Sequence, residues 1–158
     1  MAKKSEGGFK SVCENRKARH DYFIHETYEA GIELKGTEVK SLRAGRANLR
    51  DSYGEVKNGE IFVQHLHISP YDHGNIFNHD PLRPRKLLMH KREIVRLFSK
   101  TREKGFTLVP LKIYFKRGRA KMEIALASGK HSYDKREDLK AKAARREVDR
   151  AFKDSQRE

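Results

Sequence analysis

The 158-residue sequence lacks the features that would cross-link the chain or place it in a membrane. Cys13 is the single cysteine, so an intrachain disulfide is excluded and a reducing compartment is expected. No run of about 18 apolar residues occurs, which argues against a membrane-spanning helix. The first residues, Met-Ala-Lys-Lys-Ser, lack the apolar stretch of a signal peptide. We therefore expect a cytoplasmic protein without a membrane partner.

The sequence also lacks a recognisable catalytic constellation. Glu29 and Glu33 lie four residues apart on a predicted strand, which separates them by about 13 Å, more than the roughly 5–9.5 Å of a hydrolytic pair. His65 and His67 are two potential ligands without a cysteine nearby, so they are read as ordinary strand histidines. No base adjoins Cys13, and no glycine-rich phosphate loop is present. The chain is predicted to be a binding protein, with no cofactor and no metal.

An excess of positive charge indicates what such a protein would bind. The chain has 36 Lys and Arg against 22 Asp and Glu, a formal net charge of +14. Residues 1–128 carry 26 basic and 15 acidic side chains, and residues 129–158 carry 10 and 7. A field of this sign attracts polyanions, and phosphate contacts dominate nucleic-acid binding. Nucleic acid is therefore favoured over an anionic membrane surface.

Strands are predicted where apolar and polar residues alternate. The period of two begins at Tyr22. Asn58-Gly59, between the runs 51–57 and 60–69, is typical of a two-residue hairpin, because its turn needs positive φ twice. Arg117-Gly118 is predicted to turn between two further strands. Three apolar faces are predicted: Tyr28, Ala30, Ile32 and Leu34; Thr107, Val109, Leu111, Ile113 and Phe115; and Ala120, Met122, Ile124 and Leu126.

Two helices interrupt these strands, and a charged tail follows them. A short helix is predicted over 38–43, ended by Gly45, and a longer one over 92–104, ended by Gly105. Residues 70–86 hold three of the four prolines and are predicted to be a loop. In the tail, Leu139, Ala143, Val148 and Phe152 form only a narrow apolar stripe.

These elements predict a mainly β fold, a small closed antiparallel barrel with peripheral helices and a C-terminal tail. We expect a flexible basic arm over 1–10, an RNA-binding barrel domain with the two inserted helices over 11–130, and a tail over 131–158. Because the tail has little to bury, it is expected to be disordered in the isolated protein and helical when bound.

Three basic clusters lie where loops of such a barrel are expected, at 15–20, 83–88 and 116–121. Each alone is typical of a solvated surface, but together they fit an oligonucleotide site. Glu29 is either an ordinary solvated carboxylate or an acceptor for a base edge. From these clusters, the residues predicted to bind RNA are Arg16, Lys17, Arg19, Arg85 and Lys86.

Six segments, in order along the chain, resemble one protein family. They are 15–24, 28–34, 38–45, 48–53, 80–81 with 85–88, and 134–137. Together they are similar to the SsrA-binding proteins, also called small protein B, which are the protein partners of bacterial transfer-messenger RNA. The resemblance runs from about residue 12 to the end and implies an oligonucleotide-binding-type barrel without enzymatic activity.

The same resemblance implies a role in trans-translation, the rescue of stalled ribosomes. The protein, expected to be a monomer, would hold the tRNA-like domain of the RNA and stand in for its missing anticodon arm. By position, the family's RNA contacts fall on Asn15, Glu29, Leu88 and Lys121. Its decoding-centre segment falls on Gly129, Lys130, Tyr133, Asp134, Lys135 and Arg136. Tyr133 stands where some relatives have histidine; it can stack on a base but cannot carry a positive charge. The alternative function is a general RNA chaperone or ribosome-assembly factor.

Overall fold

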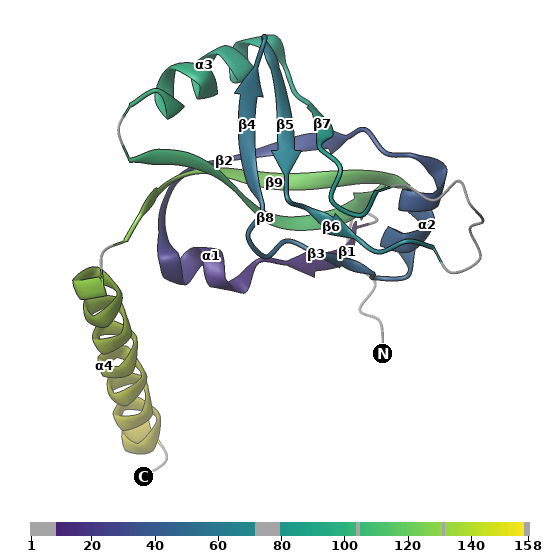
Figure 1. The fold of residues 1–158 in the computed structure, drawn as a ribbon. Coiled ribbons are helices and arrows are strands. Elements are labelled where there is room, and N and C mark those ends of the chain that lie inside the picture. Colours follow the sequence, from purple (N-terminus) through teal and green to yellow (C-terminus); the bar gives the residue numbers. More distant parts are fainter. Residues whose placement is uncertain (1–8, 72–79, 104, 131, 157–158) are drawn as a thin grey trace.

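The computed structural model describes residues 9–71, 80–103, 105–130 and 132–156 as a mainly β chain with four helices (Figure 1). The helices are α1 (Arg16–Asp21), α2 (Gly36–Arg43), α3 (Lys91–Thr101) and α4 (Ser132–Gln156). The strands are β1 (Phe9–Glu14), β2 (Tyr22–Ile32), β3 (Ala47–Asn48), β4 (Tyr53–Lys57), β5 (Glu60–Gln64), β6 (His67–Ile68), β7 (Arg85–Leu88), β8 (Phe106–Lys116) and β9 (Arg119–Gly129).

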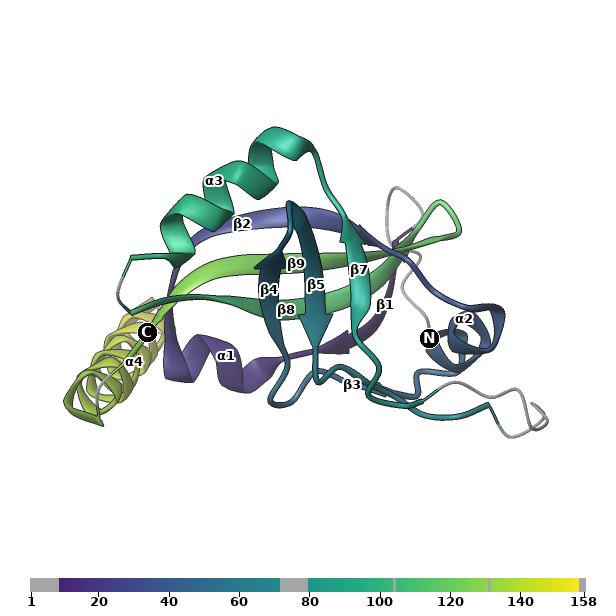
Figure 2. The same cartoon turned by 45° about the horizontal axis from the view of Figure 1, so that its top comes forward.

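One large antiparallel sheet organises the molecule. Its seven strands are ordered β1-β8-β4-β5-β7-β2-β9, and β9 also pairs with β8, so the order returns on itself. The eleven-residue strands β2, β9 and β8 lie side by side along most of their length. By contrast, β4 meets β8 at a single residue pair, Gly54 and Leu108. Figures 1 and 2 show α1 and the start of α4 at one end of the long strands and α2 with the β8–β9 turn at the other.

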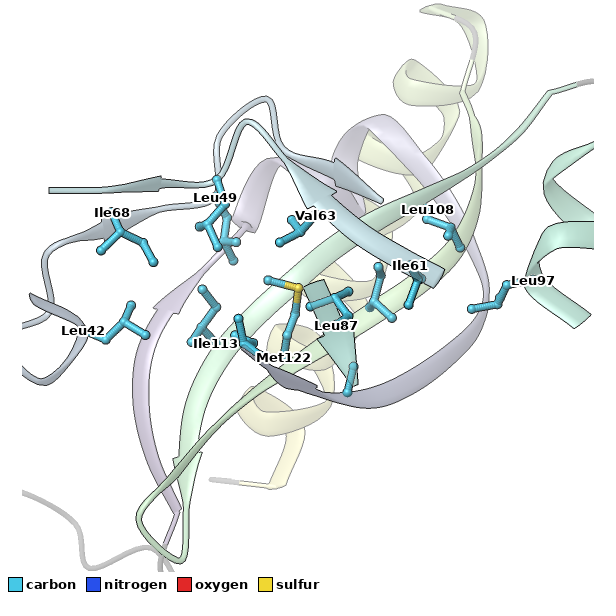
Figure 3. Packing of buried hydrophobic residues seen from close by; sticks show 14 of the residues in the cluster. Leu42, Leu49, Ile61, Val63, Ile68, Leu87, Leu97, Leu108, Ile113 and Met122 are labelled. Atoms are coloured by element: carbon cyan, nitrogen blue, oxygen red, sulfur yellow. The ribbon is translucent and has the colours of Figure 1, made fainter. Parts of the chain in front are cut away.

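The core fills the space enclosed by this curved sheet, as Figure 3 shows. Ile61, Leu87 and Met122 come from β5, β7 and β9, and each is at most 1% exposed. The helices close the ends, with Leu42 of α2 and Leu97 of α3 also buried. Each such side chain contributes about 1.5–3 kcal/mol through removal from water.

The predicted single apolar face of residues 107–115 is wrong, because β8 contains a bulge. The pairing register with β9 shifts between Pro110 and Lys112, so the side chains change sides of the sheet there. Val109 and Leu111 pack on the outer side of the sheet against Ala18 of α1. Beyond the bulge, Ile113 and Phe115 point into the main core. The predicted face of β9, from Ala120 to Leu126, is confirmed.

The turns follow the predicted chemistry. Asn58 and Gly59 have φ of 54° and 76°, which confirms the hairpin between β4 and β5. Gly45, at φ 72°, follows α2, and Gly105, at φ 89°, follows α3. The three glycines adopt this left-handed backbone without the penalty of a Cβ atom, and asparagine adopts it more readily than most other residues.

Three parts of the fold were not predicted. Residues 9 and 10 belong to β1, where Phe9 pairs with Lys116, so a loose arm over 1–10 is too long; residues 1–8 lie outside the described chain. The cluster at 15–20 forms helix α1 instead of leading directly into a strand. The proline-rich segment 70–86 ends in β7, which begins at Arg85; within it, 72–79 are not described.

The tail contains the long helix α4, which extends away from the sheet (Figures 1 and 2). All its side chains from Leu139 to Lys153 are exposed, including Val148 and Phe152 at 67% and 62%. The tail is helical in the structure, whereas its disorder in the isolated protein and its ordering on the ribosome stay predictions. Of the described helices, none is both long and apolar enough to cross a membrane.

The contact between β4 and β8 predicts a position that tolerates only glycine. A Cβ atom on Gly54 would lie 2.7 Å from Leu108 Cβ and 2.8 Å from Ile124 Cδ1. Gly54→Ala should therefore lower the free energy of unfolding in denaturant titrations by about 1–3 kcal/mol. The control is Gly36→Ala, since no atom lies within 4 Å of a Cβ there and stability should stay equal or rise slightly. Equal stability of Gly54→Ala and the wild type would contradict the close approach.

Candidate nucleic-acid interface

Three of the predicted RNA-binding residues, Glu29, Leu88 and Lys121, lie around Gly31 near the end of β2. Gly31 pairs with Leu88 of β7 on one side and with Lys121 of β9 on the other. Because Gly31 has no side chain, Leu88 folds over it, and a Cβ on Gly31 would lie 3.3 Å from Leu88 Cβ. Leu88 is nevertheless 54% exposed, which is unusual for a leucine in a strand. Its apolar surface is available to a partner.

A groove of about 680 Å³ runs from this point along α3. Glu29, Lys86, Leu88 and Lys121 all line it, so the structure brings together four residues that are far apart in the sequence. The β5 end and the N-terminal half of α3 form its other wall, with Glu60, Lys91 and Ile94. The groove combines exposed apolar surface with charges of both signs.

Glu29 is held in place by two residues of β8. The Tyr114 hydroxyl donates a hydrogen bond to Glu29 Oε2, and Lys116 Nζ lies 3.4 Å from Oε1. The hydrogen bond from Tyr114, with a smaller contribution from Lys116, lowers the pKa of the Glu29 carboxyl. Glu29 is thus an ionised and oriented acceptor, and its carboxylate still has unused lone pairs for a ligand. Sequence reasoning missed Tyr114, which is buried and lies 85 positions away from Glu29.

Cations surround this carboxylate. Besides the groove, Glu29 lines a separate depression at the β8–β9 turn. The other residues that line this depression are all basic: Lys116, Arg117, Arg119 and Lys121. Arg117 and Gly118 have φ of 52° and 78°, which makes the turn tight and keeps the four cations close together. The predicted basic cluster 116–121 therefore forms one surface with Glu29.

The prediction that Arg85 contacts RNA has to be corrected. Its side chain is 0% exposed, and all three guanidinium nitrogens form hydrogen bonds inside the protein. Arg85 Nε lies 2.5 Å from Glu38 Oε2, Nη1 lies 2.5 Å from the Leu66 carbonyl oxygen, and Nη2 bonds the Pro81 carbonyl. A buried charge needs such partners, so Arg85 supports the fold and is not exposed to a ligand.

Glu38 is the centre of that buried network. Its carboxylate also accepts hydrogen bonds from Arg83 and from the Lys35 backbone N–H at the start of α2. Burial disfavours its charge, but the arginine and backbone hydrogen bonds outweigh burial and lower the pKa of Glu38. Nothing in the sequence marked Glu38 as buried. Lys86, the neighbour of Arg85, stays at the surface in a 3.1 Å ion pair with Glu60.

The predicted cluster at α1 lies on a different surface. Tyr22, next to α1, and Glu29 lie seven positions apart along β2, a span of about 23 Å. The Asn15 amide donates to the Pro110 carbonyl at 3.1 Å, so Asn15 secures the β8 bulge. Arg16, Lys17 and Arg19 are exposed. The predicted RNA-binding residues thus fall on two separate surfaces.

The decoding-centre segment starts where β9 ends. Lys130 is tied to α1 and the start of β2: its backbone N–H donates to the Asp21 carbonyl at 2.8 Å, and its ammonium lies 5.0 Å from the centre of the Phe23 ring. Gly129, before it, pairs with Tyr22. Arg136 is exposed on α4; Tyr133, Asp134 and Lys135 belong to α4, and their side chains lie outside the description.

Metal and thiol chemistry find no support in the described residues. No group of three or more His, Cys, Asp or Glu side chains there could hold a metal ion. Burial raises the pKa of Cys13 to about 11, so its thiol stays protonated.

Comparison with known proteins decides the family. The model of the SmpB protein family matches residues 12–154. The chain belongs to this family. The SsrA-binding protein of Desulforudis audaxviator is 64% identical over 151 residues, which cover 96% of this chain and 97% of the relative. The SsrA-binding protein of Clostridium kluyveri is 58% identical over 154 residues, with 98% of both chains covered.

A solved structure of the SmpB family agrees with the fold. It is described as "tmRNA-SmpB: a journey to the center of the bacterial ribosome" and is 57% identical in sequence. The TM-score is 0.65, and the superposition covers 76% of this chain and 85% of the other.

The contacts of Glu29 predict a specific change in its titration. Tyr114→Phe removes the hydroxyl but keeps the ring, so the pKa of Glu29 should rise toward the ordinary value of about 4.3. An acid with a lowered pKa stabilises the fold above its unfolded pKa and loses this effect as pH falls through the folded pKa. Tyr114→Phe should therefore reduce the loss of stability on acidification. Carboxyl-carbon NMR titration measures the shift.

The matched control for this titration is Tyr28→Phe. The Tyr28 hydroxyl donates to Glu26 at 2.5 Å, and hydrogen bonds from Arg96 and Tyr28 lower the pKa of Glu26 to about 2. This variant should move the titration of Glu26 and leave that of Glu29 unchanged. An unchanged Glu29 in Tyr114→Phe would show that the hydroxyl does not hold it.

Proposed function

We propose that this protein binds the tRNA-like domain of transfer-messenger RNA and delivers it to stalled ribosomes for trans-translation. Full-length similarity to SsrA-binding proteins supports this function. The related structure, described as a tmRNA–SmpB assembly and the bacterial ribosome, supports the same pair of partners. The protein itself acts as a non-enzymatic binder in the cytoplasm, as a monomer.

The observation that carries the proposal is the surface around Gly31. Glu29, Leu88 and Lys121, three of the four positions that the family resemblance selects, lie together on one groove although 92 positions separate the first from the last. The groove offers an oriented acceptor, an apolar contact and a cation. RNA with unstacked bases can use all three, since it presents base edges, base faces and phosphates together.

The fold fits an oligonucleotide-binding-type barrel, which we propose as its class. The return of the strand order from β9 to β8 removes most exposed edges, and loops and helices surround the enclosed core. In this arrangement the body, roughly 11–130, holds the RNA elbow and takes the place of the missing anticodon arm. The tail over 131–158 is the part that reaches the decoding centre and message channel.

Glu29 should contribute more to specific binding than its charge suggests. Removing an acid from a protein of net charge +14 should favour non-specific RNA binding. If Glu29 accepts a hydrogen bond from a base edge, Glu29→Ala should instead cost about 1–3 kcal/mol of binding to the tRNA-like fragment. Equilibrium titration with the fragment and with an unrelated structured RNA measures both effects.

Glu33→Ala is the control, because Glu33 is exposed just beyond the end of β2 and does not line the groove. It should leave specific binding unchanged. A general RNA chaperone would bind through total charge, so Glu29→Ala and Glu33→Ala would then behave alike. Equal or tighter binding of the fragment by Glu29→Ala would defeat the proposed role.

The tail should work separately from the body. The side chains of α4 from Leu139 to Lys153 are exposed. A helix with so little to bury is marginal in water and should order only on the ribosome. Truncation before Asp134 keeps Lys130 and its contacts with α1. We expect the truncated protein to bind the tRNA-like fragment normally but to support no tagging of stalled nascent chains.

The test measures fragment binding and tagging of stalled nascent chains on the same truncated protein. Tagging at the wild-type level would show that the tail has no role in rescue. Loss of RNA binding would show that body and tail do not act independently.

A further inference from the structure

A second groove lies on the other side of Leu88 from α3. It is formed between the end of β2, helix α2 and the β8–β9 turn, and its volume is about 470 Å³. Gly31, Leu88 and Lys121 line this groove as well as the first one. Leu88 is therefore a wall between two adjoining depressions. Figures 1 and 2 show α2 and the β8–β9 turn at this same end of the sheet.

The bottom of the second groove is apolar. Ile32 and Phe115 are 8% and 4% exposed, and Leu34 and Val39 are half-buried beside them. The Arg43 guanidinium lies 5.0 Å from the centre of the Phe115 ring and covers it on one side. A flat apolar group entering the groove would contact aliphatic side chains from three elements of the fold.

The rim of the groove carries only positive charge. Arg119 and Lys121 are the charged residues that line it, and no acidic residue does. The first groove differs, since Glu29, Glu60 and Glu93 line it. Arg119 is exposed, and neither Arg119 nor Lys121 forms an ion pair within the described chain. The second groove therefore offers apolar surface below and anion-binding groups above.

We propose that this groove between α2 and the β8–β9 turn binds one unstacked nucleotide, a subsite that adds to the proposed binding of tRNA-like RNA. The base lies on Val39, Leu34 and Leu88, and the attached phosphate contacts Arg119 and Lys121. An apolar body with an anionic group at one end is the chemistry of a nucleotide turned out of a helix.

The lining also determines the kind of recognition. The side chains at the bottom have no hydrogen-bond donors or acceptors, so the subsite distinguishes an unpaired base from a paired one, not one base from another. A volume of about 470 Å³ lies within the range of about 300–1,000 Å³ that is typical of small-ligand sites. The subsite would thus read the shape of an RNA elbow.

The experiment uses the full-length protein with two RNAs, the tRNA-like fragment and a fully paired stem of equal length. Val39→Phe fills the groove and should weaken binding of the fragment about tenfold, as expected when a base loses its stacking surface, without affecting the stem. The control is Val56→Phe, because Val56 is equally half-buried but lines an apolar groove between α3 and the β4–β5 turn. It should bind both RNAs like the wild type.

A second pair of variants avoids changes to the core. Arg117 and Arg119 are both exposed on the same turn, but only Arg119 lines the second groove. Arg119→Ala should weaken binding of the fragment more than binding of the stem. Arg117→Ala should weaken binding of both RNAs slightly and equally. Normal fragment binding by Val39→Phe, or an equal loss for both RNAs in Arg119→Ala, would overturn the subsite.

A photocrosslinker separates this inference from the proposed function. With 4-thiouridine at the unpaired positions of the fragment and the wild-type protein, the expected product is a crosslink from one of these bases to Leu34, Val39 or Leu88. If the wild type binds the fragment no better than the stem, the proposed function fails, yet this crosslink would still support the subsite. Absence of a crosslink to an unpaired nucleotide at saturating fragment would overturn it.

Discussion

The buried carboxylate of Glu38 is the interaction on which the arrangement of the sheet around Gly31 depends. It joins two segments: the start of α2 through the Lys35 N–H, and the chain that enters β7 through Arg83 and Arg85. Ion pairs of this kind are costly to desolvate, and removing one partner leaves a charge buried without compensation. The network therefore contributes less through net stability than through the one geometry it permits. That geometry places β7 beside β2, and so Leu88 beside Gly31.

The long strands connect two surfaces with different properties. At one end of β2, the side chains around Gly31 combine an oriented carboxylate, exposed apolar surface and clustered cations. At the other end, α1 presents Arg16, Lys17 and Arg19, and Lys130 fixes the point from which the tail departs. A rigid antiparallel sheet between them keeps the two surfaces about 23 Å apart along β2. This separation fits the proposal that the body holds an RNA at one end and directs the tail from the other.

Local patterns in the sequence predicted the elements well where an element depends only on residues close to one another in the sequence. The period of two in β2 and β9, the Asn58-Gly59 turn and the glycines after α2 and α3 depend on residues within a few positions of one another. The bulge in β8 could not be predicted in this way, because it arises from pairing with β9 and from the outer face that α1 covers. Likewise, β7 was hidden in a proline-rich segment, since its four residues become a strand only between β5 and β2.

By itself, the sequence determined the charge, the mainly β class, the family, and the identity of Glu29, Leu88 and Lys121 as candidate contacts. The tertiary structure alone decided which of the charged residues can reach a ligand. Arg85 and Lys86 are adjacent and equally basic, yet the alternation of a strand sends one into the core toward Glu38 and the other to the surface. It also decided that Tyr114 and Lys116 hold Glu29, and that Leu88 stands between two grooves. Composition and periodicity report what a segment prefers, whereas burial and hydrogen bonding depend on partners that only folding brings together.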